Sequence, residues 1–271
     1  MGKLHIPLLL NITDKVISQK FLKDQTYDLI LIIKGRGMSV SLLQKLKQVS
    51  PEIIGYNWES FKFHKAPLKW FKNVSKYYTF DYLDAEVHKL SVVELFSYLP
   101  ERLKPDSCRY EISAILKNHS KRLQFIDKIL SSISTEKKFF HIYESNIFTF
   151  IMNFIKNPLL YIKYKKYISF KPLPYNDYAD VLLNSNFTID FGHPTQTGIT
   201  IRCFEALSSQ TKIITNNPFI SRNEYFDETN TIIFTYSSDP NMLKYRYDII
   251  KNHLPIKHNR TIFAFINDLI S

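Results

Sequence analysis

The residues best suited to chemistry lie in the segment FTIDFGHPTQTGITIRCFEALSSQTKIITN, residues 187–216. Phe187 to Phe191 is an apolar, β-branched run typical of a buried strand, and turn-forming residues follow it up to Gly198. Ile199 to Leu207 predicts a helix, and Lys212 to Thr215 returns as a strand. This is the size of a βαβ unit. The start of its helix offers unpaired N–H groups and a partial positive charge, which favour an anion such as a phosphate.

Two charged residues follow on this predicted helix. Glu205 lies two turns beyond Gly198 on the same face, where a carboxylate can accept hydrogen bonds from ribose hydroxyls while a diphosphate occupies the helix start. Arg202, one turn before Glu205, either faces the phosphates or pairs with a carboxylate. Two structural alternatives stay open: Glu205 as a buried acid satisfied by its neighbours, and the turn Gln196 to Gly198 as an ordinary helix start.

A series of strands and helices at the start of the chain indicates a first domain. Tyr27 to Ile33 predicts a buried strand, and Ser39 can cap a helix that carries Leu42, Leu43 and Leu46. Glu52 to Tyr56 and Lys76 to Phe80 predict two further strands. Alternation of strand and helix predicts a parallel sheet of Rossmann type.

A second series begins after the Pro100 to Pro105 segment, which has the composition of a linker. We predict strands at 111–116, 138–143 and 167–170 and helices at 122–133 and 175–184, followed by the βαβ unit. The fold class is therefore α/β, with two Rossmann-like domains facing a cleft. The predicted domains are residues 1–104 and 105–258, with a C-terminal helix at 259–271. Because ligands bind beyond the carboxyl ends of such strands, the loops after Phe191, Leu116 and Phe170 are expected to form one pocket.

The overall composition limits the possible functions. The chain has 271 residues, of which 45% are hydrophobic, and a formal net charge of +11. This charge favours anionic partners such as nucleotide sugars, anionic lipids or nucleic acid, but the lysines are scattered, so a solvated surface is the preferred explanation of the charge. With only Cys108 and Cys203, the chain suits a reducing compartment, and we expect a cytoplasmic protein. The histidines show no metal-ligand spacing and there is no Asp-x-Asp pair, so we predict no metal.

The segment KPLPYNDYADVLLNSNFTIDFGHPTQTGITIRCFEALSSQTKIITNN resembles bacterial glycosyltransferases of the GT-B fold, of the lipopolysaccharide and capsule type. The segments YDLILIIKGRGMS, IIGYNWESF and YYTFDYLDAE are similar to the N-terminal domain of that family. The resemblance extends from Tyr27 to about Ile233. Its most specific carriers are Lys171-Pro172-Leu173, His193-Pro194, Gln196-Thr197-Gly198, Thr200, Arg202 and Glu205-Ala206-Leu207.

The resemblance implies a glycosyltransferase that moves a sugar from a nucleotide-sugar donor to a surface glycan or lipid-linked acceptor, without a cofactor. It implies that Glu205 holds the ribose and that Arg122, or alternatively Lys121, makes a second diphosphate contact. Lys171 to Leu173 would border the nucleobase. The residues predicted to bind the diphosphate from the turn and helix are Gln196, Thr197, Gly198, Thr200 and Arg202.

The chain departs from the family in two ways. Only 26 residues precede the first strand of the resemblance, which predicts a shortened N-terminal domain. The family's Trp-Asp-Ser element is here Trp58-Glu59-Ser60. Candidates for a catalytic base are Glu59, Asp81, Asp84 and His193, each of which also has an ordinary surface, capping or turn role.

Aromatic and basic residues between Phe139 and Phe170 raise a further possibility. An anionic membrane is one possible contact for these residues, but a partly exposed helix with a solvated face is the preferred explanation. The residues concerned include Tyr161, Lys163, Tyr164, Lys165, Lys166 and Tyr167. Two other functions stay open at this stage: a non-catalytic nucleotide- or glycan-binding partner subunit and, less favoured, a nucleic-acid-binding protein. We expect no nucleic-acid partner, since no basic face is evident from the sequence.

Overall fold

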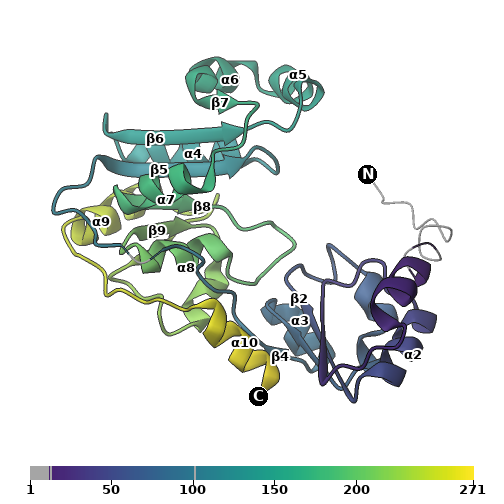
Figure 1. Cartoon of the computed structure of the whole chain (residues 1–271). Helices are drawn as coiled ribbons and strands as arrows, with labels where there is room; N and C mark the ends of the chain where they lie inside the picture. The colour runs from purple at the N-terminus through teal and green to yellow at the C-terminus, as the bar shows by residue number, and fades with distance from the viewer. Residues whose placement is uncertain (1–11, 13, 101) are drawn as a thin grey trace. The chain divides into compact units, whose positions relative to one another are not determined.

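The computed structural model describes residues 12, 14–100 and 102–271 (Figure 1). The chain divides into two compact units. Unit 1 runs to Leu95 and also takes in Thr195–Gly198 and Phe263–Ser271, while unit 2 comprises Phe96–Pro194 and Ile199–Ile262. The division falls before the proline-rich segment expected as the linker, of which residue 101 lies outside the described part. The C-terminal helix belongs to unit 1.

Unit 1 is built on a parallel sheet with the strand order β1-β2-β3-β4. Ser39 caps the first long helix as expected, because its Oγ accepts a hydrogen bond of 2.9 Å from the Leu42 N–H group. Asp81 caps the next helix in the same way, through the Asp84 N–H group. Unit 1 contains β1 (Leu29–Ile33), α2 (Val40–Val49), β2 (Glu52–Asn57), β3 (Lys76–Thr79), α3 (Tyr82–His88), β4 (Ser91–Val92) and α10 (Ile262–Ile270), together with short helical turns at Ser18–Leu22, Ala66–Lys69 and Phe71–Asn73.

Unit 2 contains a second parallel sheet, in the order β10-β9-β8-β5-β6-β7. Its strands are β5 (Tyr110–Lys117), β6 (Lys138–Tyr143), β7 (Ile168–Ser169), β8 (Ser185–Asp190), β9 (Lys212–Thr215) and β10 (Thr231–Ile233). Its helices are α4 (Arg122–Ser132), α5 (Ile147–Lys156), α6 (Pro158–Tyr164), α7 (Tyr175–Leu183), α8 (Ile201–Ser208) and α9 (Pro240–Ile250). The expected α/β fold with parallel sheets is therefore confirmed.

The order of strands in unit 2 fixes where a ligand site can form. From β5 the chain adds β6 and β7 on one side of the sheet, then returns to add β8, β9 and β10 on the other side. The boundary between β5 and β8 is therefore a topological switch point, and loops at the carboxyl ends of these two strands diverge to opposite sides. Such a crevice is the usual binding place in an open parallel sheet.

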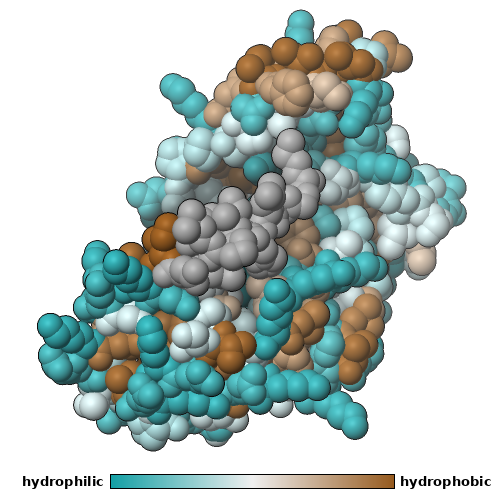
Figure 2. All heavy atoms as spheres, turned by 90° about the vertical axis from the view of Figure 1, so that its right-hand side faces the viewer, coloured by the Kyte–Doolittle hydropathy of each residue, from teal (hydrophilic) through white to brown (hydrophobic). Residues whose placement is uncertain are grey.

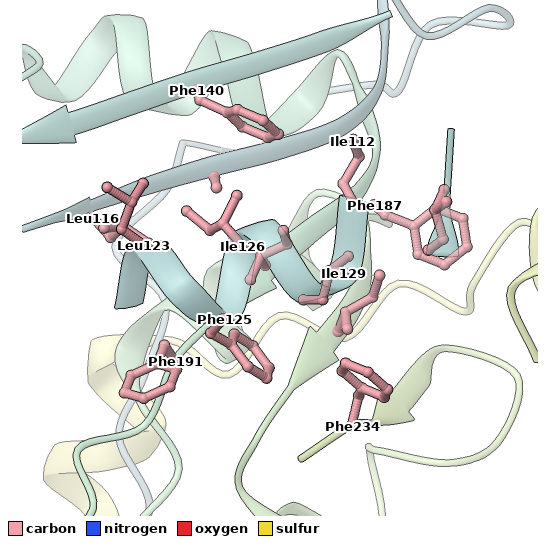
Figure 3. Close-up of a cluster of buried hydrophobic side chains, with 14 of the residues drawn as sticks. Ile112, Leu116, Leu123, Phe125, Ile126, Ile129, Phe140, Phe187, Phe191 and Phe234 are labelled. Carbon is pink, nitrogen blue, oxygen red and sulfur yellow. The ribbon is translucent and has the colours of Figure 1, made fainter. Parts of the chain in front are cut away.

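The core of unit 2 joins α4 to the sheet (Figure 3). Leu123, Ile126 and Ile129 of α4 are at most 1% exposed and lie among side chains of the strands. Phe125 makes an edge-on ring contact with Phe191, which follows β8, at 5.1 Å between centroids. This packing fixes α4 and the end of β8 relative to each other, so the residues at their tips have defined positions.

No helix in the described part of the chain is long and apolar enough to cross a membrane.

Candidate nucleotide-sugar site

A pocket of about 500 Å³ opens in unit 2 beside the switch point. Three elements supply most of its wall: the carboxyl ends of β5 and β6, the segment from the end of β7 into α7, and the first turns of α8. Its volume is in the range that small-molecule ligands occupy. The lining residues are Ile115, Leu116, Lys117, His141, Tyr143, Pro172, Leu173, Tyr175, Tyr178, Thr200, Ile201, Arg202 and Glu205.

Four of the residues predicted from the sequence meet in this pocket. They are Leu173, Thr200, Arg202 and Glu205. The expected neighbour Lys171 stands just outside the lining, and its carbonyl oxygen lies 2.9 Å from Nε2 of His141. Beyond Leu173 and its neighbour Pro172, the wall continues with Ile115 and Tyr143, so this side of the pocket is largely apolar.

Glu205 is the buried acid of the pocket, at 3% exposure. Its Oε1 accepts a hydrogen bond of 3.0 Å from the Tyr175 hydroxyl, and its Oε2 accepts one of 2.7 Å from the Tyr178 hydroxyl. Burial raises the pKa of Glu205, while both tyrosine hydrogen bonds and the charge of Arg202 act in the opposite direction. Each oxygen keeps a second lone pair, so the carboxylate can accept further hydrogen bonds from a ligand.

The start of α8 faces the same pocket. Thr200 is the N-cap residue, but its side chain makes no capping hydrogen bond, because its hydroxyl donates to Oδ1 of Asp190 at 2.8 Å. The Cys203 N–H group of the first turn donates to the Thr200 carbonyl oxygen at 3.0 Å, while the Ile201 and Arg202 N–H groups at the helix start are left to a ligand or to solvent. Arg202 lies in this turn and adds a full positive charge to the partial charge of the helix start. The combination suits a phosphate or diphosphate.

A cluster of basic side chains surrounds this end of the pocket. Burial, and after it the charges of Arg122, His193, Lys117 and Arg202, lower the pKa of His119 to about 4. The rings of His119 and His193 lie 6.0 Å apart between centroids. Burial and the charge of Arg122 also lower the pKa of His193. An anion bound among these groups would relieve their mutual repulsion.

Arg122 belongs to this cluster, but its guanidinium group already donates hydrogen bonds to backbone carbonyl oxygens. Its guanidinium donates to the carbonyl oxygens of Lys117 and Phe191, both at 3.1 Å, and it is only 8% exposed. Burial, and then the charge of Arg202, lower its pKa to about 10. Its Nε is buried and has no hydrogen-bond partner among the described residues. The alternative Lys121 is exposed and has a left-handed backbone conformation, at φ 65°.

The turn before α8 makes hydrogen bonds and close contacts to other residues of unit 1. The Thr197 N–H group donates to Oδ2 of Asp81 at 2.7 Å, and the Thr197 hydroxyl donates to Oδ1 of Asp81 at 2.9 Å. A Cβ added at Gly198 would lie 2.5 Å from the carbonyl oxygen of Phe80. Gln196 belongs to the same segment of unit 1. Thr197 and Asp81 thus stabilise each other, and their expected roles in diphosphate binding and catalysis stay predictions.

The remaining acids of unit 1 differ in their environments. Glu59 forms two ion pairs, in which its Oε1 lies 2.8 Å from Lys34 Nζ and its Oε2 lies 3.0 Å from a guanidinium nitrogen of Arg36. Burial acts to raise its pKa, but the hydrogen bonds and charges of those two cations lower it overall. In contrast, burial raises the pKa of Asp84 to about 6, with the Phe61 N–H group opposing and Asp81 adding to the shift. A group that titrates near neutrality is the better candidate for a base.

Several lining residues were not identified from the sequence. His141 belongs to β6 and lines the pocket because the sheet order places β6 beside β5, an order that no short motif reveals. His119, just beyond the end of β5, lies outside the lining but within the cluster of basic side chains. Tyr175 and Tyr178 carried a local signal, since their spacing of three places both on one face of a helix. That signal identifies a shared face but not the acid that the two hydroxyls bind.

Comparisons with known proteins bear on the fold. No protein-family model matches the chain, and no curated protein sequence matches it. Among solved structures, the chain is similar to AviGT4, a glycosyltransferase involved in avilamycin A biosynthesis, with a TM-score of 0.61 at 10% identity over 95% of this chain and 76% of that one. It is similar to Anabaena Alr3699/HepE in complex with UDP-glucose, with a TM-score of 0.61 at 8% identity over 96% and 80% of the two chains. It is also similar to the UDP-GlcNAc 2-epimerase from Methanocaldococcus jannaschii, with a TM-score of 0.52 at 12% identity over 96% and 79%.

These likenesses define the class of fold. The chain has the α/β fold with parallel sheets that GT-B glycosyltransferases share. Identities of this size establish the fold alone, and one neighbour is named as an epimerase rather than a transferase. The activity must therefore be argued from the pocket.

Proposed function

We propose that this protein is a glycosyltransferase that takes its donor, a nucleotide sugar, into the pocket of unit 2. The observation that carries the proposal is that Glu205, Arg202 and the start of α8, which has no side-chain cap, line one pocket together with the apolar residues Ile115, Pro172 and Leu173. A nucleoside diphosphate has the matching sequence of groups: a flat base, a ribose with two hydroxyls, and a dianionic diphosphate.

The fit assigns each part of the donor a place. The ribose hydroxyls donate to the free lone pairs of Glu205, which the two tyrosines hold in position. The diphosphate lies at the start of α8 against Arg202, within the field of Arg122, His119 and His193. The base lies against Pro172, Leu173 and Tyr143, with Lys171 at the edge.

Glycosyl transfer requires stabilisation of the departing nucleoside diphosphate as negative charge develops on it. Fixed cations and helix N–H groups supply this stabilisation without rearrangement. We propose that Arg202 and the α8 start provide it directly and that Arg122 contributes through its charge. On this reading neither a metal nor a cofactor is needed for the leaving group.

The acceptor side is proposed from the resemblance. We infer a surface glycan of the lipopolysaccharide or capsule type, or its lipid-linked precursor, reached from the cytoplasmic face of the membrane. Glu59, Asp81 and His193 are the proposed groups for activating the acceptor hydroxyl. Asp84, also a candidate from the sequence, is kept in this set because burial raises its pKa to about 6 and a base that titrates near neutrality transfers protons most effectively.

Thermal unfolding with a panel of UDP, GDP, ADP and CMP sugars tests the donor site, because a ligand that binds only the folded state raises the melting temperature. The donor that gives a shift is then incubated with wild type and the Glu205→Ala variant, and released nucleotide is measured. Release of nucleoside diphosphate by wild type, lost in the variant, supports the transferase. Conversion of the sugar with the nucleotide still attached indicates an epimerase instead.

Binding without turnover, whatever the acceptor, would favour the non-catalytic partner subunit. One observation gives this second candidate weight: Glu59 is paired with both Lys34 and Arg36, and its lowered pKa makes it a weak base. Absence of any shift across the panel would refute the donor site itself.

A further inference from the structure

Helix α5 exposes an apolar face that nothing in the described chain covers. Ile147, Phe148, Ile151, Met152 and Ile155 repeat with helical spacing, and all five side chains are exposed. Phe148 and Ile155 are 67% and 69% exposed. In the space-filling view, apolar atoms gather at the top of the molecule, over α5 and α6 (Figure 2). Exposed apolar surface grouped in this way marks a contact with a partner or a lipid.

The opposite face of α5 is packed, so the exposed face is presented by a fixed helix. Phe150 makes edge-on ring contacts with Tyr161 at 5.4 Å and with Phe170 at 5.6 Å, and Phe154 contacts Tyr161 at 6.2 Å. Asn146 caps the helix by accepting from the Thr149 N–H group at 2.8 Å. The sequence-based expectation that Tyr161 and Tyr164 face a membrane is wrong, because they are 3% and 2% exposed and belong to the core.

Helix α6 continues the apolar surface. Leu159 and Ile162 are 82% and 55% exposed and lie one turn apart. The ten residues of α5 are far too few to span a bilayer, which takes about 20. An amphipathic helix of this kind lies in the plane of the interface, with its apolar face toward the acyl chains.

The charge of the segment selects the type of surface. From Ser145 to Pro174 the chain contains five lysines and no aspartate or glutamate. Lys156, Lys165 and Lys166 are exposed, whereas Lys163 pairs with Asp127 at 2.5 Å. Lysines beside an exposed apolar face complement the anionic headgroups of a membrane, with their stems along the apolar surface.

The same segment is anchored beside the donor pocket. Glu144, which directly follows the pocket residue Tyr143, is fully buried and accepts hydrogen bonds from Asn118 at 2.7 Å and from the Tyr161 hydroxyl. After α6 the chain returns through β7 to Pro172 and Leu173, on the pocket wall. A surface that α5 and α6 contact therefore lies next to the site proposed for the donor.

We propose that the exposed face of α5 and α6 docks on an anionic lipid membrane, with Phe148, Ile151 and Ile155 entering the interface and Lys156 and Lys165 contacting headgroups. This deepens the proposed function, since it brings the donor pocket to the place where a lipid-linked acceptor would lie. Membrane binding and donor binding are measured separately, so a negative result for one proposal does not affect the test of the other.

Flotation of the full chain with lipid vesicles tests the proposal. Vesicles of phosphatidylcholine with and without 30% phosphatidylglycerol are compared, and we expect wild type to partition at least tenfold more strongly to the anionic ones. The triple variant Phe148→Gln, Ile151→Gln, Ile155→Gln keeps charge and helix propensity, and we expect it to lose partition by more than about a hundredfold, from three lost apolar side chains. The Lys156→Gln, Lys165→Gln variant is expected to lose roughly thirtyfold on anionic vesicles, from about 1 kcal/mol for each lysine.

A matched control is available on α9, where Met242, Tyr245 and Ile249 are also exposed. Their replacement by Gln should leave vesicle binding unchanged, and circular dichroism should show both triple variants folded. Equal loss in the α9 variant, or no binding of wild type to anionic vesicles, overturns the proposal. Concentration-dependent dimerisation of wild type without vesicle binding, abolished by the α5 substitutions, assigns the face to a second copy of the chain and equally overturns it.

Discussion

Replacement of Glu205 by Gln separates the ligand role of this carboxylate from its structural role. Burial raises the folded-state pKa of Glu205 above its ordinary value, so ionisation costs stability once the pH is above that value. The stability linked to this group is present at low pH and is lost as the pH rises through the folded pKa. Gln removes the buried charge at neutral pH while keeping one acceptor and one donor for Tyr175 and Tyr178. We therefore expect unfolding free energy to change by less than about 1 kcal/mol.

Donor affinity should behave differently. A hydrogen bond to a charged acceptor contributes about 1.5–3 kcal/mol and one to a neutral acceptor about 0.5–1.5 kcal/mol. Two ribose hydroxyls on Glu205 should thus lose about 2 kcal/mol in Glu205→Gln, or roughly a thirtyfold rise in Kd. Isothermal titration with the best nucleoside diphosphate from the panel measures it.

The 2′-deoxy form of the same nucleotide tests whether the contact is to the ribose. Wild type should discriminate against the deoxy form, and Glu205→Gln should discriminate much less. Glu111→Gln is the matched control, since Glu111 also accepts from a tyrosine hydroxyl, that of Tyr247, but lies at the amino end of β5 away from the pocket. Equal discrimination by Glu205→Gln and wild type would refute the ribose assignment, whatever the change in Kd.

Three further predictions test other parts of the structure. Arg202→Ala should raise the Kd for a nucleoside diphosphate tenfold or more, because about 1.5–3 kcal/mol of charge-assisted hydrogen bonding is lost. The affinity for the nucleoside without phosphates should stay nearly unchanged. Equal losses of affinity for both ligands would contradict a contact between Arg202 and the phosphates. The imidazole of His119 has a pKa of about 4, and NMR titration should show a higher pKa when a nucleoside diphosphate is bound. Because the folded-state pKa of His119 lies below the unfolded value, its contribution to stability should be lost as the pH falls from about 6.5 to 4. A pKa of His119 that does not change on ligand binding would place the anion elsewhere. Gly198→Ala should destabilise unit 1 by about 1–3 kcal/mol in chemical denaturation, because the added Cβ would lie against the Phe80 carbonyl oxygen. Gly192→Ala should cost less, because the nearest atom to its added Cβ would be 3.5 Å away, an ordinary contact distance. Equal losses of stability in the two variants would be inconsistent with the close approach of Gly198 to Phe80.

The strands that the sequence predicted are those that lie in runs rich in aromatic and β-branched residues. β6 and β9 match the predicted ranges at both ends, because each is a short run rich in aromatic or β-branched side chains. The short strands β4 and β10 were not predicted, since two or three residues give no periodicity and their pairing depends on strands far away in the sequence. Propensity identifies an element, but an edge strand is decided by its partner.

The candidate site was predictable where it depends on one helix. Arg202 and Glu205 share the first turns of α8, so helical spacing alone placed them together. His141 and Tyr178 come from a strand and a helix that the sheet order brings to the pocket, and spacing along the sequence does not encode that order. Thr197 shows that composition alone does not identify the partner of a turn. Its turn has the composition of a phosphate-binding loop, but the Thr197 N–H group and hydroxyl both donate to Asp81.

The two tyrosines on Glu205 have a consequence for selectivity among ligands. Because both carboxylate oxygens are oriented before anything binds, a pentose arrives at a preorganised acceptor and little entropy is lost in ordering it. That advantage is the same for uridine, guanosine or adenosine. Choice between these nucleosides must then arise at the other end of the pocket, from the shape and edge contacts that Pro172, Leu173 and Tyr143 offer to an aromatic ring.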